Sequence, residues 1–345
     1  MSPERQAATG IGPIETVDYH TAGEPFRIVT GGVPEIPGDT VLERRRYARD
    51  HLDAVRRLLI DEPRGHADMY GAHVVPPNDA GADLGVIFFH NEGYSTACGH
   101  GTIALITWAI EAGRIEAREP VTEVGLDVPS GRLACRAQVA DGKVESVEFT
   151  NVPAYVEATD LELPTSRGPV HLDVAFGGAF YGSLEARRVG LDVSPVSLPA
   201  LIALERELRR ELDEALGPTH PDEPELRGTY GIIYWQTETA EDGVELVQRN
   251  VTVFADGEVD RSPCGSGTSA RLALLDASGE LPRGRVLRHR SIVDSVFHGR
   301  VIGDGPPVGG RPSVMTTVSG SAYRTGTHTF ELDPRDNLGT GFLLR

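Results

Sequence analysis

Short apolar stretches recur along the chain, many of them alternating with polar residues, and clusters of Gly, Pro, Asn and Asp separate them. Alternation of this kind is typical of strands that bury one face, and the clusters favour turns. We therefore expect an α/β fold with short strands and few helices. The expected strands are 26–31, 84–89, 132–140, 144–150, 170–176, 229–235, 244–255, 313–320 and 322–332.

Two segments have the spacing of amphipathic helices. The first, near 49–60, stops before Pro63, and the second, near 198–216, has Ser197 at the N-cap position and Gly217 beyond its end. Their apolar faces consist of Leu52, Val55, Leu58 and Leu59 in the first and Leu204, Leu208 and Leu212 in the second.

Two further helices are expected behind an internal repeat. The stretches are STACGHGTIALITWAIEAG and SPCGSGTSARLALLDASG, which match at Cys-Gly-x-Gly-Thr beginning with Cys98 and Cys264. The match extends to a glycine after each helix, Gly113 and Gly279, placed as a C′ residue. Two related halves are the natural interpretation of such a repeat.

A chain of 345 residues is long enough to form two domains. We expect an N-terminal lobe over 13–155, completed by the C-terminal segment 325–345, and a C-terminal lobe over 156–324. The start, MSPERQAATGIG, reads as a mobile tail over 1–12.

The net charge of −18 argues against nucleic acid or an anionic membrane as partner, because both attract basic surfaces. No apolar run approaches the roughly 20 residues of a membrane span, and the N-terminus lacks the apolar core of a signal peptide. A cytoplasmic location is expected.

The lysine and cysteine content limits the cofactors and metal sites that we expect. Lys143, the only lysine, stands in the turn ADGKVE, which makes a pyridoxal Schiff base a poor expectation. The three cysteines form no metal-binding spacing, and Cys135 lies in an alternating strand pattern typical of a packed thiol. We expect neither a metal nor any other cofactor.

The two repeated cysteines begin helices, where the helix dipole stabilises a thiolate and unpaired N–H groups can hold a carboxylate. Three other interpretations compete. GHGTIA and GSGTSA fit a loose dinucleotide fingerprint, but neither has the strand before it nor the acidic residue after it that the motif needs. In the second, Cys98 is the nucleophile of a hydrolase and His100 its base, but this gives Cys264 no role. In the third, both thiols are structural, but this does not explain why they are repeated.

Two matched thiols suit inversion of a carbon next to a carboxylate. One thiolate removes the proton from one face while the opposite thiol delivers a proton to the other. The N–H groups that hold the carboxylate also stabilise the enediolate.

The sequence resembles the proline racemase family over nearly its whole length. The segments that carry the resemblance are DYHTAGEPFRIVTGG, EPRGHADMYGA, HNEGYSTACGHGTIAL, VAFGGAFY, NVTVFADGEVDRSPCGSGTSAR, SIVDSVFHGRV and GTGFLLR. The resemblance implies a cofactor-independent enzyme with the diaminopimelate epimerase type of fold. In that fold, two pseudo-symmetric lobes each wrap a mostly antiparallel sheet around a central helix, with the active site in the cleft between them.

The resemblance also implies roles for individual residues. Cys98 and Cys264 are the acid/base pair, and Asp260 holds the ring nitrogen of the substrate; DRSP could otherwise be a surface turn. His66 and Asp68 are weaker correspondences, for which a structural loop is an equal interpretation. The residues expected around the substrate carboxylate are Gly99, His100, Gly265 and Ser266.

The family contains proline racemases, hydroxyproline 2-epimerases and trans-3-hydroxy-L-proline dehydratases. Apart from the cysteine pair, the sequence is most similar to the dehydratases. Dehydratases typically carry threonine where Cys264 stands, whereas racemases and epimerases keep this second thiol. Ala97 and Ser266 also replace a common methionine and a common threonine. We expect free proline or hydroxyproline as the small-molecule substrate, with epimerisation and dehydration both open. A homodimer is left open as well, and the alternative is a binding protein without turnover.

Overall fold

The computed structural model describes residues 12–239 and 246–344 and divides into two compact units. The first contains residues up to 21, residues 25–147 and the C-terminal segment from Ser321; the second contains Ala22–Glu24 and Glu148–Gly320. The tail expected over 1–12 lies outside the described residues except for Gly12.

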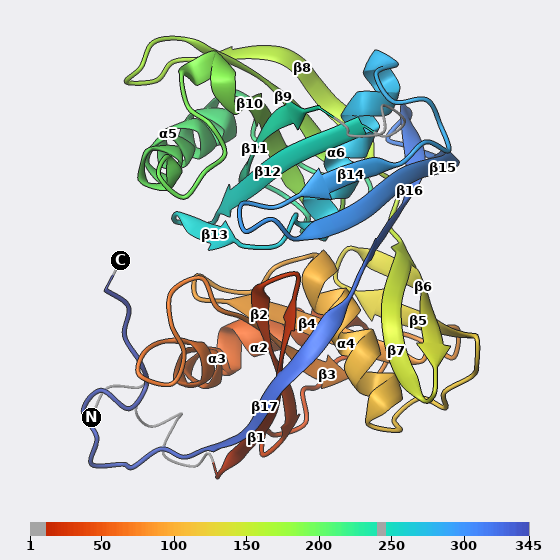
Figure 1. Cartoon of the computed structure of the whole chain (residues 1–345). Coiled ribbons are helices and arrows are strands. Elements are labelled where there is room, and N and C mark those ends of the chain that lie inside the picture. The colour runs from red at the N-terminus through yellow and green to blue at the C-terminus, as the bar shows by residue number, and fades with distance from the viewer. Residues whose placement is uncertain (1–11, 240–245, 345) are drawn as a thin grey trace. The chain divides into compact units, whose positions relative to one another are not determined.

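The first unit is built on a mixed sheet (Figure 1). Its strands follow the order β17–β1–β2–β3–β4–β5–β6, with parallel pairs at β2–β3 and β4–β5. The strands are β1 (Ile14–Thr21), β2 (Glu24–Gly31), β3 (Tyr70–Val75), β4 (Leu84–His90), β5 (Val121–Val128), β6 (Gly131–Ala140) and β17 (Ala322–Phe330), and β7 (Lys143–Thr150) runs on into the second unit. The helices are α2 (Val41–His51), α3 (Asp53–Ile60) and α4 (Gly99–Glu111).

The second unit follows a similar plan. Its strands follow the order β8–β9–β10–β11–β12–β14–β15–β16, with parallel pairs at β10–β11 and β12–β14, and β13 pairs with β12. The strands are β8 (Tyr155–Leu163), β9 (Val170–Phe176), β10 (Phe180–Glu185), β11 (Thr229–Glu238), β12 (Leu246–Phe254), β13 (Glu258–Asp260), β14 (Leu287–Arg290), β15 (Val296–Val308) and β16 (Arg311–Gly320). The helices are α5 (Leu198–Ala215) and α6 (Gly265–Ser278), with a 3₁₀ turn at Ala186–Val189.

The sheet pattern repeats between the units. In the first unit, strands β1 to β6 pair in chain order, and the pairs β2–β3 and β4–β5 are parallel. In the second unit, β9, β10, β11, β12, β14 and β15 also pair in chain order, and the pairs β10–β11 and β12–β14 are parallel. The first parallel crossover carries α3 or α5, and the second carries α4 or α6. The internal repeat is thus visible in the fold, and the expected α/β class with few helices is confirmed.

Helices α4 and α6 are central to their units. Almost every residue of α4 is buried, as are the first eleven of α6, because strands pack around each helix rather than along one face (Figure 1). A helix that is buried on all sides is typical of the core of a domain. Gly113 and Gly279 follow the two helices with φ of 67° and 74°, which confirms their placement as left-handed terminators.

Two helix predictions need correction. The single helix expected near 49–60 is in fact α2 and α3, interrupted at Leu52, and α2 begins at Val41 behind a capping box of Thr40 and Glu43. Because α2 is mainly polar, it has no apolar stripe to reveal it. Ser197 precedes α5 as expected, but its hydroxyl donates to Asp192 and does not cap the helix.

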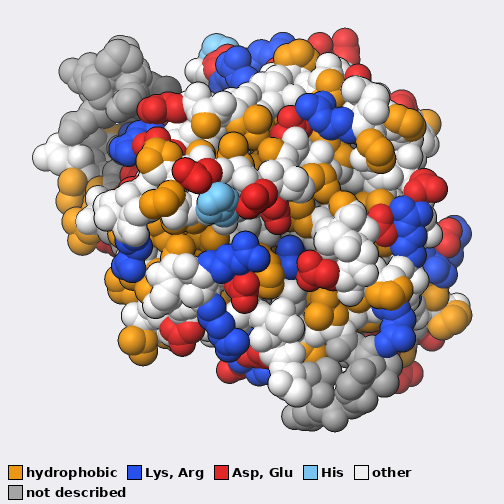
Figure 2. Space-filling model, turned by 90° about the horizontal axis from the view of Figure 1, so that it is seen from above, with side chains coloured by type: hydrophobic (Ala, Val, Ile, Leu, Met, Phe, Trp, Pro, Cys, Tyr) orange, Lys and Arg blue, Asp and Glu red, His pale blue; other side chains and the backbone are white. Residues whose placement is uncertain are grey.

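Charged side chains of both signs are interspersed on the face shown in Figure 2. The ion pairs among the described residues include Arg283 with Asp276 at 2.7 Å and with Asp304 at 2.8 Å. Exposed pairs of this kind contribute little to stability. No helix of the described residues is long and apolar enough to cross a bilayer.

Candidate active site

Cys98 is the N-cap residue of α4. Its backbone is extended, and its sulfur accepts a hydrogen bond from Gly101 N–H at 3.3 Å. Thr102 Oγ1 donates to the Cys98 carbonyl at 2.9 Å. The thiol is therefore held against the first turn of a buried helix, where the dipole favours a thiolate.

The imidazole ring of His100 lies against the same sulfur. Its Nε2 is 3.4 Å and its Nδ1 3.6 Å from Cys98 Sγ. Phe26 and Tyr70 meet the ring edge-on, with centroids 5.7 and 5.0 Å away, and Thr21 Oγ1 donates to the His100 carbonyl at 2.8 Å. This packing fixes the ring where it can exchange a proton with the thiol.

Cys264 is the N-cap residue of α6 and has a different backbone. Its φ is 61° and ψ 107°, in a region that residues other than glycine rarely occupy. Ser262 Oγ accepts a hydrogen bond from the Cys264 N–H at 3.1 Å, and Thr268 Oγ1 donates to the Pro263 carbonyl at 3.2 Å. Strain of this kind persists only where the surroundings determine the turn, and it is frequent at functional sites.

The second glycine of each turn makes room for the sulfur. A Cβ atom at Gly101 would lie 2.8 Å from Cys98 Sγ, and one at Gly267 would lie 2.9 Å from Cys264 Sγ. Both contacts are shorter than side chains tolerate. The second glycine of the Cys-Gly-x-Gly pattern is therefore required beside the sulfur in both units, and at Gly101 a Cβ atom would also lie 2.4 Å from the Phe26 ring.

The expectation of a readily ionised thiol is not met at Cys264. Burial, and next to it the charge of Asp260, raise the pKa of this thiol to about 12. Hydrogen bonds with the Gly267 N–H, the Thr252 hydroxyl and the Tyr181 hydroxyl lower the pKa in part. Cys264 is therefore a protonated thiol at neutral pH.

Tyr181 of β10 contacts this second turn. Cys264 Sγ donates to the Tyr181 hydroxyl at 3.8 Å, and that hydroxyl lies 2.7 Å from Ser266 Oγ. The strand comes this close because Gly177, in the turn before it, lies against α6, where a Cβ atom would be 2.3 Å from the Ser266 carbonyl oxygen.

A buried histidine supports the turn from the other side. His289 Nδ1 lies 2.8 Å from Thr268 Oγ1, which in turn donates to Pro263. Burial lowers the pKa of His289 to about 3, so the ring is neutral. We infer that its Nδ1–H donates to Thr268.

The other predicted residues fall in two groups. Gly99 and Gly265 are the first residues of α4 and α6, and Asp260 ends β13, buried, with Oδ1 accepting from Ser262 N–H at 2.8 Å. His66 is exposed, its Nδ1 2.7 Å from the Ala67 carbonyl oxygen, whereas Asp68 is buried with a φ of 64°. Gly99 and His100 thus belong to the Cys98 turn, and Asp260, Gly265 and Ser266 belong to the Cys264 turn.

Cys135 is a packed thiol, as expected. It is buried on β6, and burial raises its pKa to about 12. No cluster of three or more His, Cys, Asp or Glu side chains suited to a metal ion occurs among the described residues.

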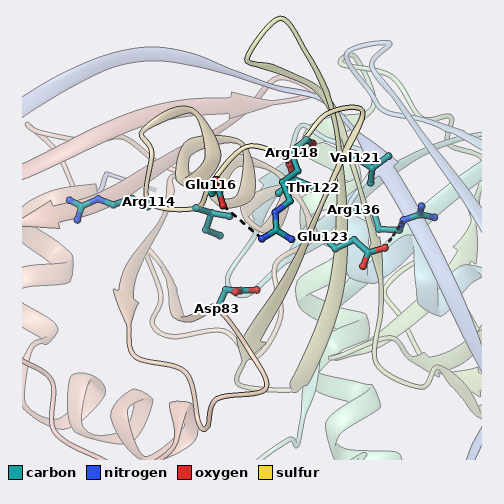
Figure 3. Close-up of a pocket in the computed structure, with 9 residues that line it drawn as sticks. Asp83, Arg114, Glu116, Arg118, Val121, Thr122, Glu123 and Arg136 are labelled. Carbon is teal, nitrogen blue, oxygen red and sulfur yellow. Dashed lines mark hydrogen bonds and ion pairs between the residues drawn. The ribbon is translucent and has the colours of Figure 1, made fainter.

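The hollow shown in Figure 3 lies at the other end of α4 from Cys98. It has a volume of about 520 Å³, and its charges are largely paired, Arg118 with Glu116 at 3.8 Å and Arg136 with Glu123 at 3.7 Å. A helix of 13 residues separates Arg114 on its rim from the thiol, a distance of roughly 20 Å at 1.5 Å per residue. This hollow has no part in the thiol chemistry.

Comparison with known proteins gives consistent matches. A family model described as proline racemase matches residues 16–343. A trans-3-hydroxy-L-proline dehydratase of Bacillus cereus is 45% identical over 329 residues, covering 95% of this chain and 97% of the relative. A 3-hydroxyproline 2-epimerase of Burkholderia multivorans is 44% identical over 333 residues, covering 96% of this chain and 98% of the relative.

A solved structure has the same fold. The hydroxyproline epimerase of Agrobacterium vitis, with bound trans-4-hydroxy-L-proline, superposes with a TM-score of 0.88 at 34% identity and covers 96% of both chains. These matches confirm the resemblance drawn from the sequence motifs.

Proposed function

Because the chain belongs to the proline racemase family of enzymes, we propose that it acts without a cofactor at Cα of free 3-hydroxyproline, with Cys98 and Cys264 as its acid/base pair. The observation that carries this proposal is the pair of matched thiols, each at the start of a buried helix in a unit of the same plan. The names of the dehydratase and epimerase relatives, both of which act on 3-hydroxyproline, support the substrate.

In the proposed epimerisation, the Cys98 thiolate removes the Cα proton from one face. The electrons left at Cα spread into the carboxylate as an enediolate, which N–H groups of the helix starts stabilise. The Cys264 thiol then gives its proton to the opposite face, so that Cys98 ends as thiol and Cys264 as thiolate. The reverse reaction exchanges the two roles.

His100 and the protonated state of Cys264 support this division of labour. The His100 ring is 3.4 Å from Cys98 Sγ and can take the proton that the Cys98 thiol loses when it becomes a thiolate. Burial raises the pKa of Cys264 to about 12, as suits the group that delivers a proton.

Dehydration of trans-3-hydroxy-L-proline is the second candidate, favoured by the dehydratase relative. Cys98 would again take the Cα proton, and the C3–O bond would break; the leaving hydroxide takes up the proton held by Cys98 and departs as water, which regenerates the thiolate. The resulting enamine tautomerises to Δ1-pyrroline-2-carboxylate. This reaction needs only one thiol at Cα.

The test is incubation in D₂O with trans-3-hydroxy-L-proline, trans-4-hydroxy-L-proline and L-proline. Epimerisation places deuterium at Cα of the product epimer, and dehydration forms Δ1-pyrroline-2-carboxylate. We expect the 3-hydroxy compound to react fastest. Faster turnover of either other amino acid would refute the substrate, and no deuterium or pyrroline from any of the three would indicate a binding protein.

A further inference from the structure

We propose that the Tyr181 hydroxyl is a further catalytic group, which hydrogen-bonds to the Cys264 sulfur in both its thiol and its thiolate state and stabilises the thiolate. The proposal rests on the proposed function, because it takes Cys264 as one of the two proton-transferring groups. Tyr181 is buried on β10, and its side chain belongs to the cluster that surrounds Cys264.

The geometry forms a short chain of three groups. The sulfur of Cys264 lies 3.8 Å from the oxygen of Tyr181, which lies 2.7 Å from Ser266 Oγ. In the contact between the two hydroxyls, either oxygen can be the donor. All three side chains are buried, which keeps competing water away.

This chain can serve both states of the sulfur. While Cys264 is a thiol, S–H donates to Tyr181 and the phenol O–H donates to Ser266. Once Cys264 has given its proton away, the phenol O–H can rotate to donate to the thiolate, and the Ser266 O–H can donate to the phenol oxygen. This rearrangement transfers no proton between the three side chains, because only the two hydroxyl groups rotate.

The hydrogen bond is worth more to the thiolate than to the thiol. A thiol is a weak donor, whereas a bond from O–H to an anion is charge-assisted and about twice as strong as a neutral one. Since burial disfavours the charged form of Cys264, the hydroxyl of Tyr181 offsets part of that cost. Removing it therefore makes thiolate formation harder.

In the first unit a phenyl ring has the place of this phenol. Strand β2 has the place in its sheet that β10 has in the other, and Phe26 of β2 packs against His100 as Tyr181 contacts Ser266. His100 and Ser266 are the matched residues of the two turns. Tyr181 with Ser266 at one turn thus corresponds to Phe26 with His100 at the other, where Tyr70 also meets the imidazole edge-on.

The test measures alkylation of the two thiols in the same full-length protein. Iodoacetamide is applied at pH 8.5, and the modification of Cys98 and Cys264 is followed separately by mass spectrometry of tryptic peptides. Arg261 and Arg271 flank Cys264, so trypsin releases it on its own peptide. The variants are Tyr181→Phe and, as matched control, Tyr155→Phe, which removes a buried phenol hydroxyl of the same unit that has no hydrogen-bond partner among the described residues.

We expect Tyr181→Phe to slow alkylation of Cys264 about tenfold, the effect of raising its pKa by about one unit. Cys98 in that variant, and both thiols in Tyr155→Phe, should react at the wild-type rate. Loss of a hydroxyl can only widen access to the sulfur, which would speed the reaction, so a slower rate reports ionisation. An unchanged or faster rate at Cys264 would overturn the proposal.

Ser266→Ala supplies the test if Tyr181→Phe fails to fold. It removes the outer member of the chain, and we expect a fall of about threefold at Cys264 with none at Cys98, smaller because the phenol remains. Equal rates in wild type and Ser266→Ala would then refute the proposal. Because alkylation needs no turnover, these outcomes are independent of whether the protein epimerises hydroxyproline.

Discussion

The two cysteine turns have the same sequence plan and different chemical surroundings. Cys98 has an extended backbone and an imidazole ring 3.4 Å from its sulfur. Cys264 has a left-handed backbone, a phenol at 3.8 Å, and a pKa that burial raises to about 12. A repeated motif has therefore been given two environments, one suited to holding a thiolate and the other to holding a proton.

The difference comes from residues outside the repeated glycines. At the matched position after the first glycine stand His100 and Ser266, and the facing strands contribute Phe26 and Tyr181. The larger His100 faces the phenyl ring of Phe26, and the smaller Ser266 faces the phenol of Tyr181. Exchanging single members of these sets should separate the roles of the two turns.

The largest expected effect follows removal of the first thiol. Cys98→Ser should reduce both epimerisation and dehydration at least about 10³-fold, because an alcohol is a far weaker base than a helix-terminus thiolate. The measurement is kcat/KM from the deuterium and pyrroline assays, with Cys135→Ala as control, since that thiol is buried on β6 and does not belong to the repeat. Retention of a tenth of the activity in Cys98→Ser would contradict the assignment.

Replacing the second thiol should separate the two reactions. Cys264→Thr should lower epimerisation about 10²-fold or more, because threonine does not exchange a proton at neutral pH as a thiol can. Dehydration of trans-3-hydroxy-L-proline should persist, since Cys98 alone takes the Cα proton. Epimerisation left intact in this variant would mean that Cys264 is a structural thiol and that the repeat has another cause.

The sequence predicted those parts of the molecule that depend on local pattern. The two Cys-Gly-x-Gly turns, the helices behind them and their terminal glycines could be read from the repeat and from the needs of a helix end. The polar α2 and the short, glycine-containing β10 could not, because neither has an apolar period.

The neighbours of Cys264 could not be predicted either. Tyr181 and Ser266 are 85 residues apart, and their contact depends on the close approach of Gly177 to α6. His289 reaches Thr268 across 21 residues through the pairing of β12 with β14. VAFGGAFY supported the family resemblance, but nothing in these letters indicated a hydroxyl directed at a sulfur.

A smaller effect is expected at the imidazole. His100→Gln removes the ring nitrogens at 3.4 and 3.6 Å from Cys98 Sγ while keeping a polar side chain of similar length. Alkylation of Cys98 at neutral pH should slow about tenfold, because the thiol loses its proton acceptor. Cys264 in the same protein should react as before and serves as the internal control; an equal change at both thiols would indicate a general loss of structure.

The smallest expected effect concerns the threonines that close the two turns. Thr102→Val removes a donor to the Cys98 carbonyl, which keeps its helical bond from the Thr102 N–H at 3.0 Å. Thr268→Val leaves the Pro263 carbonyl without that donor and His289 Nδ1 without its partner. A buried polar group without a partner costs about 1–3 kcal/mol, whereas a redundant hydrogen bond costs about 0.5 kcal/mol.

Urea unfolding of both variants measures this contrast. We expect Thr268→Val to lower the free energy of unfolding by about 1–2 kcal/mol more than Thr102→Val. Thr268→Ser, which keeps the hydroxyl, should recover most of the loss, because it can still accept from His289 and donate to Pro263. Equal destabilisation by the two valine variants would mean that His289 does not support the strained turn, and that the left-handed backbone of Cys264 is held by Ser262 and the helix alone.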